Sequence, residues 1–465
     1  MIGKKSINVF VLTMINLATI LSIRNWPMSA KYGLSSISFL ILAMLVFFIP
    51  SAMASAELAT HFPKKGGIFI WVKEALGHRV GFLSVWLLWI ENVVWYPVIL
   101  SFIATSFAYS FNQSLSANNW YMFAMITGIF WIITCTNLMG MTLSGWISSL
   151  GVIFGTLIPG VLIIILSIIW ICKGLPSNIS FSWKAMVPDI TNFSKLSYLA
   201  GILLSFCGME MSAVHAKDVE NPQKNYSRAI FISGFIIILL TILGTLSIAI
   251  VIPQNDVSLL SGSMEAIYKL LSSIGLHNLV HLVAILIAVG ALGGVSTWTA
   301  GPCRGLLAAA EDGDFPPLMR RANKHNMPIN LMIMQAIIVS LLSIVFIFMP
   351  TVSSSFWLLT VLSSQLYLIM YILMFMSCII LRYKEKNSPN AYKIPGGNIG
   401  LWGVNILGLI SCIFTIVIGF FPPEGIGITN KLFFELFLLS GIIIFCGAPF
   451  LIYAMRTEKW IHPKI

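Results

Sequence analysis

The chain has 465 residues, of which 58% are apolar and only 9% are charged. Soluble domains carry about 25% charged residues, so this chain lacks the polar surface that a water-soluble fold of its length needs. The formal net charge is +11, but no basic soluble segment gathers it, which argues against a nucleic-acid-binding protein.

Long apolar runs recur along the chain and predict a polytopic membrane protein. Runs such as 152–171 and 231–252 are long enough to cross about 30 Å of hydrocarbon as a helix. The short alternating segments of a transmembrane barrel are absent from the sequence. The prediction is all-α, with about twelve spans at 7–30, 35–59, 80–112, 120–140, 143–172, 195–216, 226–252, 277–311, 329–349, 353–382, 400–421 and 430–456.

The basic residues are distributed unevenly between the two sides of the predicted bundle. With the N-terminus placed in the cytoplasm, 19 Lys and Arg lie on the cytoplasmic side, six lie on the other side, and Arg24 and Arg304 lie within spans. Because positive residues concentrate on the cytoplasmic side, we predict an even number of spans, with both termini cytoplasmic. The first run is not expected to be a signal peptide, since it lacks a small-residue cleavage site.

The cysteine and histidine spacings indicate neither a metal site nor a redox site. The seven cysteines are scattered without a CxxC pair, and the seven histidines show no HExxH spacing. Cys207 adjoins a predicted helix break, and nearby His215 is expected to be structural. We predict no metal and no cofactor, and the sequence contains no P-loop motif for binding ATP. No soluble segment or linker is visible, so residues 1–465 are expected to form one transmembrane domain.

Two predicted spans contain helix-breaking residues. Residues 20–27 end in a proline that a regular helix does not accommodate. Residues 205–210 place Gly208 and the carboxylate of Glu210 inside an apolar segment. A carboxylate at mid-membrane costs roughly 2.5–3.5 kcal/mol and usually faces a cavity or a partner. Broken helices in corresponding positions of two halves are typical of transporter substrate sites. This spacing predicts repeats at about 7–172 and 195–382, with two extra helices at about 400–456.

Five short blocks occur in order along these spans. They are 24–27 with 31–35; 57–59 with Pro63 and 66–72; 205–210 with 221–222; 301–306 with 312–313; and 394–397. Together they resemble the amino acid–polyamine–organocation transporters, most closely the bacterial glutamate/γ-aminobutyrate antiporter group. The resemblance covers nearly the whole chain.

The resemblance implies a LeuT-like fold with a five-plus-five inverted repeat and broken helices 1 and 6. It implies an amino acid transporter, not an enzyme. We expect a secondary active antiporter of the glutamate/γ-aminobutyrate type, or for a related amino acid, working by alternating access with amino acids, the lipid bilayer and protons as partners. The expected transport-path residues are Ser22, Arg24, Trp26, Ser205, Phe206, Cys207, Gly208, Glu210, Gly294, Trp298, Tyr367 and Tyr371, and the expected gate residues are Arg304 and Asp312.

Four of these residues have two possible roles each. Glu210 either titrates or contacts the substrate amine, or it binds freed backbone N–H groups as a structural carboxylate. Arg24 either pairs with a substrate carboxylate or Glu210, or it lies toward the outer surface. Tyr367, with Tyr371 one helical turn away, either gates the path or packs between helices.

The chain departs from the resembled group in three places. Ile20 and Leu21 stand where many members of the wider family have the first two residues of a Gly-Ser-Gly-like triplet. Gly294 stands where the antiporter has an acidic residue, and the tail is expected to be too short for the antiporter's C-terminal plug. Strict glutamate/γ-aminobutyrate exchange is therefore in question. The alternatives are a proton-coupled amino acid uptake permease and, from other classes, a channel or a membrane enzyme.

Overall fold

The computed structural model describes residues 7–62, 66–140, 151, 153–191, 193–213, 219–325, 327–384, 392–428 and 430–461. Within these ranges the chain forms helices and no strand, apart from isolated bridges between Ile7 and Val219 and between Ala322 and Pro328. The predicted all-α fold class is confirmed. The expected start of the fifth span at 143–150 and the prediction for His215 lie outside the described residues.

In the described part of the chain, ten helices are long and apolar enough to cross a membrane, and one bent pair raises the number to eleven. The bent pair is α1 (Val9–Ile20) with η1 (Ile23–Asn25) and α2 (Trp26–Ala30). Seven of the others are single helices: α6 (His78–Phe111), α7 (Asn119–Leu138), α14 (Pro222–Val251), α16 (Leu279–Glu311), α19 (Val352–Lys384), α20 (Gly397–Ile418) and α21 (Lys431–Ala454). Three are made of consecutive helical segments: η2 (Gly33–Ser35), α3 (Ser36–Ala43), η3 (Met44–Phe48) and α4 (Ile49–His61) form one, η5 (Ile153–Leu157) and α9 (Ile158–Cys172) form another, and α17 (Ile329–Ser343) and α18 (Val345–Phe348) form the third.

The expected span at 195–216 is divided in two. It contains α12 (Leu199–Ser205) and α13 (Met209–Ala213), and each helix is too short to cross a membrane alone. The structure therefore does not confirm a count of twelve spans. Short helices connect the long ones: α5 (Ile68–Leu76), η4 (Gln113–Ala117), α10 (Trp183–Met186), α11 (Phe193–Leu196), η7 (Gln254–Asp256), α15 (Gly262–Ser272), η8 (Pro317–Arg320) and α22 (Glu458–Ile461).

Helix α6 lies at the centre of the bundle. It packs against α16, α19, α5 and α7, and most of its side chains are buried, including Trp89 and Tyr96. The outer helices α20 and α21 instead expose apolar side chains such as Ile410 and Leu436. Such surfaces suit hydrocarbon rather than water. The protein is accordingly a multi-pass membrane protein.

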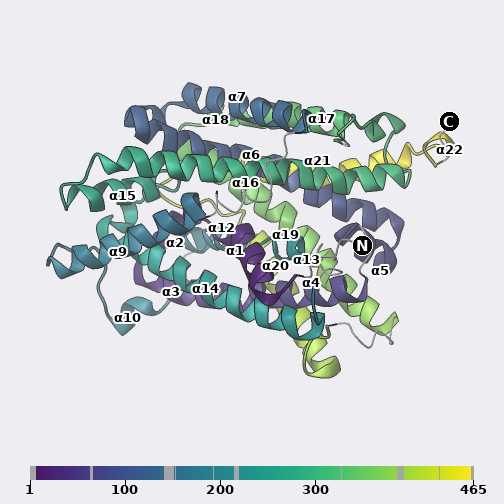
Figure 1. Ribbon diagram of the computed structural model, residues 1–465, viewed down its shortest axis with the longest axis horizontal. Helices are drawn as coiled ribbons and strands as arrows, with labels where there is room; N and C mark the ends of the chain where they lie inside the picture. The colour runs from purple at the N-terminus through teal and green to yellow at the C-terminus, as the bar shows by residue number, and fades with distance from the viewer. Residues whose placement is uncertain are drawn as a thin grey trace.

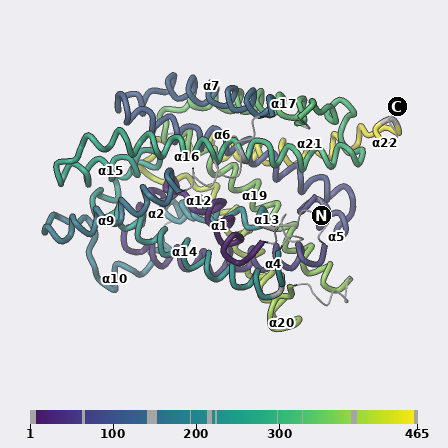
Figure 2. The backbone as a smooth tube through the Cα atoms, viewed as in Figure 1, coloured from purple at the N-terminus to yellow at the C-terminus, as the bar shows by residue number. Residues whose placement is uncertain are grey.

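The long helices run side by side along the length of the molecule (Figure 1). The first and last described segments lie at the same end of the bundle, together with α5 and α22, while α15 lies at the opposite end (Figure 2). We call these the terminal end and the far end. Helix α6 runs from the terminal end to the far end, whereas α16 and α19 run the other way.

Candidate substrate cavity between two broken helices

The first break separates α1 from η1. Leu21 and Ser22 are extended, with ψ angles of 119° and 126°, so the helix stops after Ile20 and resumes at Ile23. The two parts are inclined by 43°. Pro27 lies in the first turn of α2, where its missing N–H costs no helical hydrogen bond. The break predicted at 20–27 is therefore confirmed, and it begins directly after Ile20.

The second break separates α12 from α13. Gly208 has a φ of +115°, a conformation that side chains with a Cβ rarely adopt, and its N–H donates to the Tyr371 hydroxyl at 2.8 Å. A Cβ at this position would lie 2.8 Å from Cγ2 of Thr19. The second break thus lies directly against the end of α1, and the two interruptions predicted from sequence meet in space.

A cavity of about 130 Å³ lies beside these breaks. Its wall is formed by both breaks together with α6, η5, α16 and α19. Seven of the expected path residues line it: Ser22, Arg24, Ser205, Cys207, Gly294, Trp298 and Tyr367. The cavity is small, which limits an occupant to a small molecule.

Five expected path residues do not line the cavity: Trp26, Phe206, Gly208, Glu210 and Tyr371. Trp26 is buried against Gly160 and Gly244, where its ring occupies the space that a Cβ would fill. Phe206 packs on Phe48 with ring centroids 5.8 Å apart. The expectation that these two aromatic side chains border the path is not met in this structure, because both fill gaps between helices.

Glu210 lies behind the cavity wall and is held by two tyrosines. The hydroxyls of Tyr367 and Tyr371 each donate to one of its carboxylate oxygens. Tyr367 itself lines the cavity. Since Tyr371 also accepts from the Gly208 N–H, the three side chains connect the second break to α19. Glu210 therefore has hydroxyl partners on both oxygens.

Arg24 lies on the cavity wall and not at the outer surface. Its side chain is 4% exposed, and its guanidinium carbon is 5.3 Å from the ring centroid of Trp95. The Nε and Nη1 atoms have no hydrogen-bond partner among the described residues. Glu91 is the other charged residue of the wall, and it accepts hydrogen bonds from Asn92 Nδ2 at 2.5 Å and from the Ser363 hydroxyl at 3.3 Å.

Several wall residues were not predicted from the sequence, notably Asn25, Asn92, Trp95 and Thr156. Trp95 follows Glu91 by four residues on α6 and so lies on the same helical face. That spacing, next to a buried carboxylate, could have identified it. Thr156 lies in a π-helical segment, and no sequence signal places that segment against the cavity.

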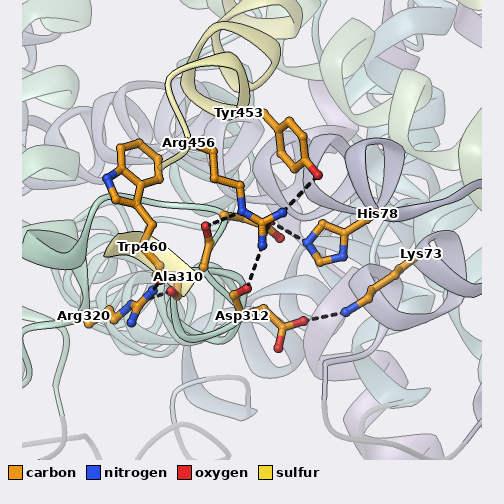
Figure 3. A network of polar contacts seen from close by, with 10 residues as sticks. Lys73, His78, Ala310, Asp312, Arg320, Tyr453, Arg456 and Trp460 are labelled. Atoms are coloured by element: carbon orange, nitrogen blue, oxygen red, sulfur yellow. Dashed lines mark hydrogen bonds and ion pairs between the residues drawn. The ribbon is translucent and has the colours of Figure 1, made fainter. Parts of the chain in front are cut away.

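The two expected gate residues have different partners. The Arg304 guanidinium contacts the sulfur of Met327 at 3.4 Å. Asp312 pairs instead with Lys73 at 2.6 Å, across the terminal end of the bundle (Figure 3). The sequence distance between these two residues gives no hint of their pairing.

A second group of charged residues surrounds Asp314 at the terminal end. Its carboxylate is 2.5 Å from His78 Nε2 and 3.7 Å from Arg456 Nη2. Burial raises the pKa of Asp314, and the neighbouring His78 and Arg456 oppose this shift. The Arg456 guanidinium also donates to the Tyr453 hydroxyl at 3.0 Å (Figure 3). These contacts hold the C-terminal segment against the start of α6.

The residues that the structure describes contain no group of three or more His, Cys, Asp or Glu side chains that could hold a metal ion.

A multi-pass helical bundle with a small cavity beside two broken helices has the architecture of a secondary transporter. The amino acid permease family model matches residues 6–445, and the chain belongs to this family of the amino acid–polyamine–organocation transporters. The chain is 41% identical over 457 residues to an uncharacterised transporter of Legionella pneumophila, covering 98% of both chains. It is 31% identical to a glutamate/γ-aminobutyrate antiporter of Lactococcus lactis, covering 98% of this chain and 92% of the relative. A probable agmatine/putrescine antiporter of Lactococcus lactis is 24% identical, with 83% of each chain covered.

These matches confirm the predicted family and show that the chain is a transporter of the amino acid and polyamine group, not an enzyme. The LeuT-like fold with broken helices 1 and 6 agrees with that family.

Proposed function

We propose that the chain is a secondary active amino acid antiporter, working by alternating access in a bacterial inner membrane with both termini in the cytoplasm. The observation that carries this proposal is the meeting of the two helix breaks beside one small cavity. Backbone groups freed at such breaks can bind an ammonium group and a carboxylate without dedicated charged side chains. An amino acid presents both groups.

The cavity wall and two ion pairs lie toward different ends of the bundle. The wall extends toward the far end through Phe102 on α6 and Ile287 on α16. At the terminal end, Lys73 pairs with Asp312 and His78 pairs with Asp314. The structure therefore supports a cycle in which these pairs separate when the cavity opens to the cytoplasm.

The moving part is proposed to be spans 1, 2, 6 and 7, rocking against the rest of the bundle. The repeats at 7–172 and 195–382 would place spans 1 and 2 of one repeat opposite their counterparts 6 and 7 in the other. The contacts of Glu210 with Tyr367 and Tyr371 then join the moving second break to α19, which belongs to the static part. Binding at the cavity and rocking would be coupled through these three side chains.

The test is exchange in proteoliposomes. Purified protein is reconstituted, and uptake of labelled glutamate, γ-aminobutyrate and other common amino acids is compared between vesicles that are empty and vesicles loaded with unlabelled amino acid. Loading is expected to accelerate uptake for at least one amino acid. Uptake that is independent of loading and driven by an imposed pH gradient would identify a proton-coupled permease instead. No uptake of any amino acid under either condition would contradict the proposed function.

A further inference from the structure

Arg24 is a buried cation without an anionic partner in the described part of the chain. It is 4% exposed, and neither Nε nor Nη1 has a hydrogen-bond partner among the described residues. Arg382, which also lies in a span, pairs with the carboxylate of Glu57 through two of its nitrogens. Because a buried charge is costly unless it is paired and hydrogen-bonded, an anion that enters the cavity would stabilise Arg24.

The surroundings hold the guanidinium in place without pairing its Nε and Nη1 donors among the described residues. It lies over the ring of Trp95, which in turn packs against Trp298 with ring centroids 6.4 Å apart. The Ser263 hydroxyl donates to the Ile23 carbonyl at 2.9 Å and so fixes η1. Glu91, the only carboxylate on the described cavity wall, is engaged by Asn92 and Ser363. The described residues therefore hold a cation at the cavity wall and do not pair it with a carboxylate.

Arg24 and the second break lie toward opposite ends of the cavity. Ser363 of α19 contacts Glu91 of α6, and the two helices run in opposite directions. Trp95 lies one turn beyond Glu91 toward the far end, and Tyr367 lies one turn beyond Ser363 toward the terminal end. At about 1.5 Å per residue, these levels are separated by roughly 12 Å along the bundle. The Arg24 end is thus distinct from the end formed by Tyr367 and the second break.

We infer that Arg24 is a specificity-determining residue that binds the distal carboxylate of the substrate, so that the site selects dicarboxylic amino acids and their α-decarboxylation products. This inference rests on the proposed function, in which freed backbone groups at the breaks bind the α-amino acid end. Removal of the α-carboxylate from glutamate leaves γ-aminobutyrate, and both molecules keep the same distal carboxylate. A guanidinium binds that group through two parallel hydrogen bonds. Diamines such as putrescine lack it.

The inference separates two kinds of relative. The name of the glutamate/γ-aminobutyrate antiporter of Lactococcus lactis gives two substrates that each carry a distal carboxylate. The name of the probable agmatine/putrescine antiporter gives two cations that have no carboxylate. An unpaired Arg24 would repel those cations. The cavity chemistry therefore favours the first substrate class for this chain.

The experiment compares glutamate with glutamine, which keeps the α-amino acid end but has an amide in place of the distal carboxylate. The purified full-length protein, R24Q, R24K and R79Q are titrated with each ligand, and the half-saturating concentration is measured from ligand-induced thermal stabilisation. R79Q is the matched control, because the Arg79 guanidinium also lies over an aromatic ring, 5.2 Å from that of Tyr453, but outside the cavity. The unliganded unfolding temperature shows whether each variant is folded.

The unmodified chain and R79Q are expected to prefer glutamate over glutamine by roughly 30-fold or more, the size of a lost buried charge pair. In R24Q, glutamate binding is expected to weaken until this ratio approaches one, with glutamine binding little changed, and R24K is expected to be intermediate. R24Q is likewise expected to lose the preference for γ-aminobutyrate over putrescine that the unmodified chain should show.

Three results would overturn the inference. The unmodified chain could bind glutamate and glutamine equally well, or a folded R24Q variant could keep the preference for glutamate. A folded R24Q variant could also lose affinity for both ligands equally, which is the result expected if Arg24 binds the α-carboxylate. In each of these results, amino acid exchange by the unmodified chain would still uphold the proposed function. Absence of exchange in the liposome assay would remove the proposed function instead.

Discussion

At the level of single residues, Glu210 and its two tyrosine partners connect the second break to α19. Both carboxylate oxygens accept from hydroxyls, and Gly208 donates to one of the same tyrosines. A glutamine here offers only one oxygen as an acceptor, so the O–H of one tyrosine loses the acceptor to which it donates. Leaving a buried polar group unsatisfied costs about 1–3 kcal/mol.

We therefore expect E210Q to lower the free energy of unfolding by about 1–3 kcal/mol and to reduce the rate of exchange more than it changes substrate affinity. Thermal unfolding and counterflow kinetics, measured in the same detergent and lipid, check both parts. Y367F combined with E210Q serves as the comparison, since it removes the unpaired hydroxyl along with the charge. An E210Q variant with unchanged stability and kinetics would show that the carboxylate has neither role.

Some residues of the site could be predicted from the sequence because their chemistry is costly in a membrane. A glycine and a carboxylate in an apolar span identified the second break, and a proline after polar residues identified the first. The wall of the cavity depends instead on which helix faces meet. Trp26 and Phe206 have the residue types of a binding site, yet the packing of α14 and η3 buries them. The partner of Asp312 was equally hidden, because Lys73 reaches it across the bundle.

At the level of helices, the site depends on close contact between the two helix breaks. Gly208 adopts a φ of +115° and lies so close to Thr19 that a Cβ would be 2.8 Å from its methyl carbon. Glycine meets both conditions, since it tolerates this conformation and has no side chain. The contact brings α1 and α13 together at the cavity.

G208A is expected to destabilise the protein by about 1–3 kcal/mol, because alanine strains this backbone conformation, and to weaken substrate binding by separating the breaks. Gly128 in α7 is the matched control: it lies within a helix, and a Cβ there would meet no atom within 4 Å. G128A should be neutral or stabilising by up to about 1 kcal/mol. Thermal unfolding with and without substrate measures both effects. Equal behaviour of the two variants would mean that the contact between the breaks is dispensable.

For the whole molecule, the proposed cycle requires the charged residues at the terminal end to keep the cavity closed on that side. The pair of Lys73 and Asp312 is partly solvated, with side chains 30% and 44% exposed, whereas the Asp314 side chain is fully buried between His78 and Arg456. A partly exposed pair contributes about 1 kcal/mol or less. Removing one partner of a buried charge group costs about 3–5 kcal/mol, since the remaining charges stay buried.

These two magnitudes predict different effects on gating. D314N is expected to open the terminal end far more than K73Q, although both variants remove one charge from the same closed surface. Hydrogen–deuterium exchange measures this directly, through the protection of the amides in η8 (Pro317–Arg320) and at the start of α6. D314N should raise exchange strongly in both segments, and K73Q only slightly. If K73Q had the larger effect, the pair of Lys73 and Asp312 would be the principal gate. If neither variant changed exchange, closure would depend on helix packing and not on these charges, and alternating access would not require these pairs to separate.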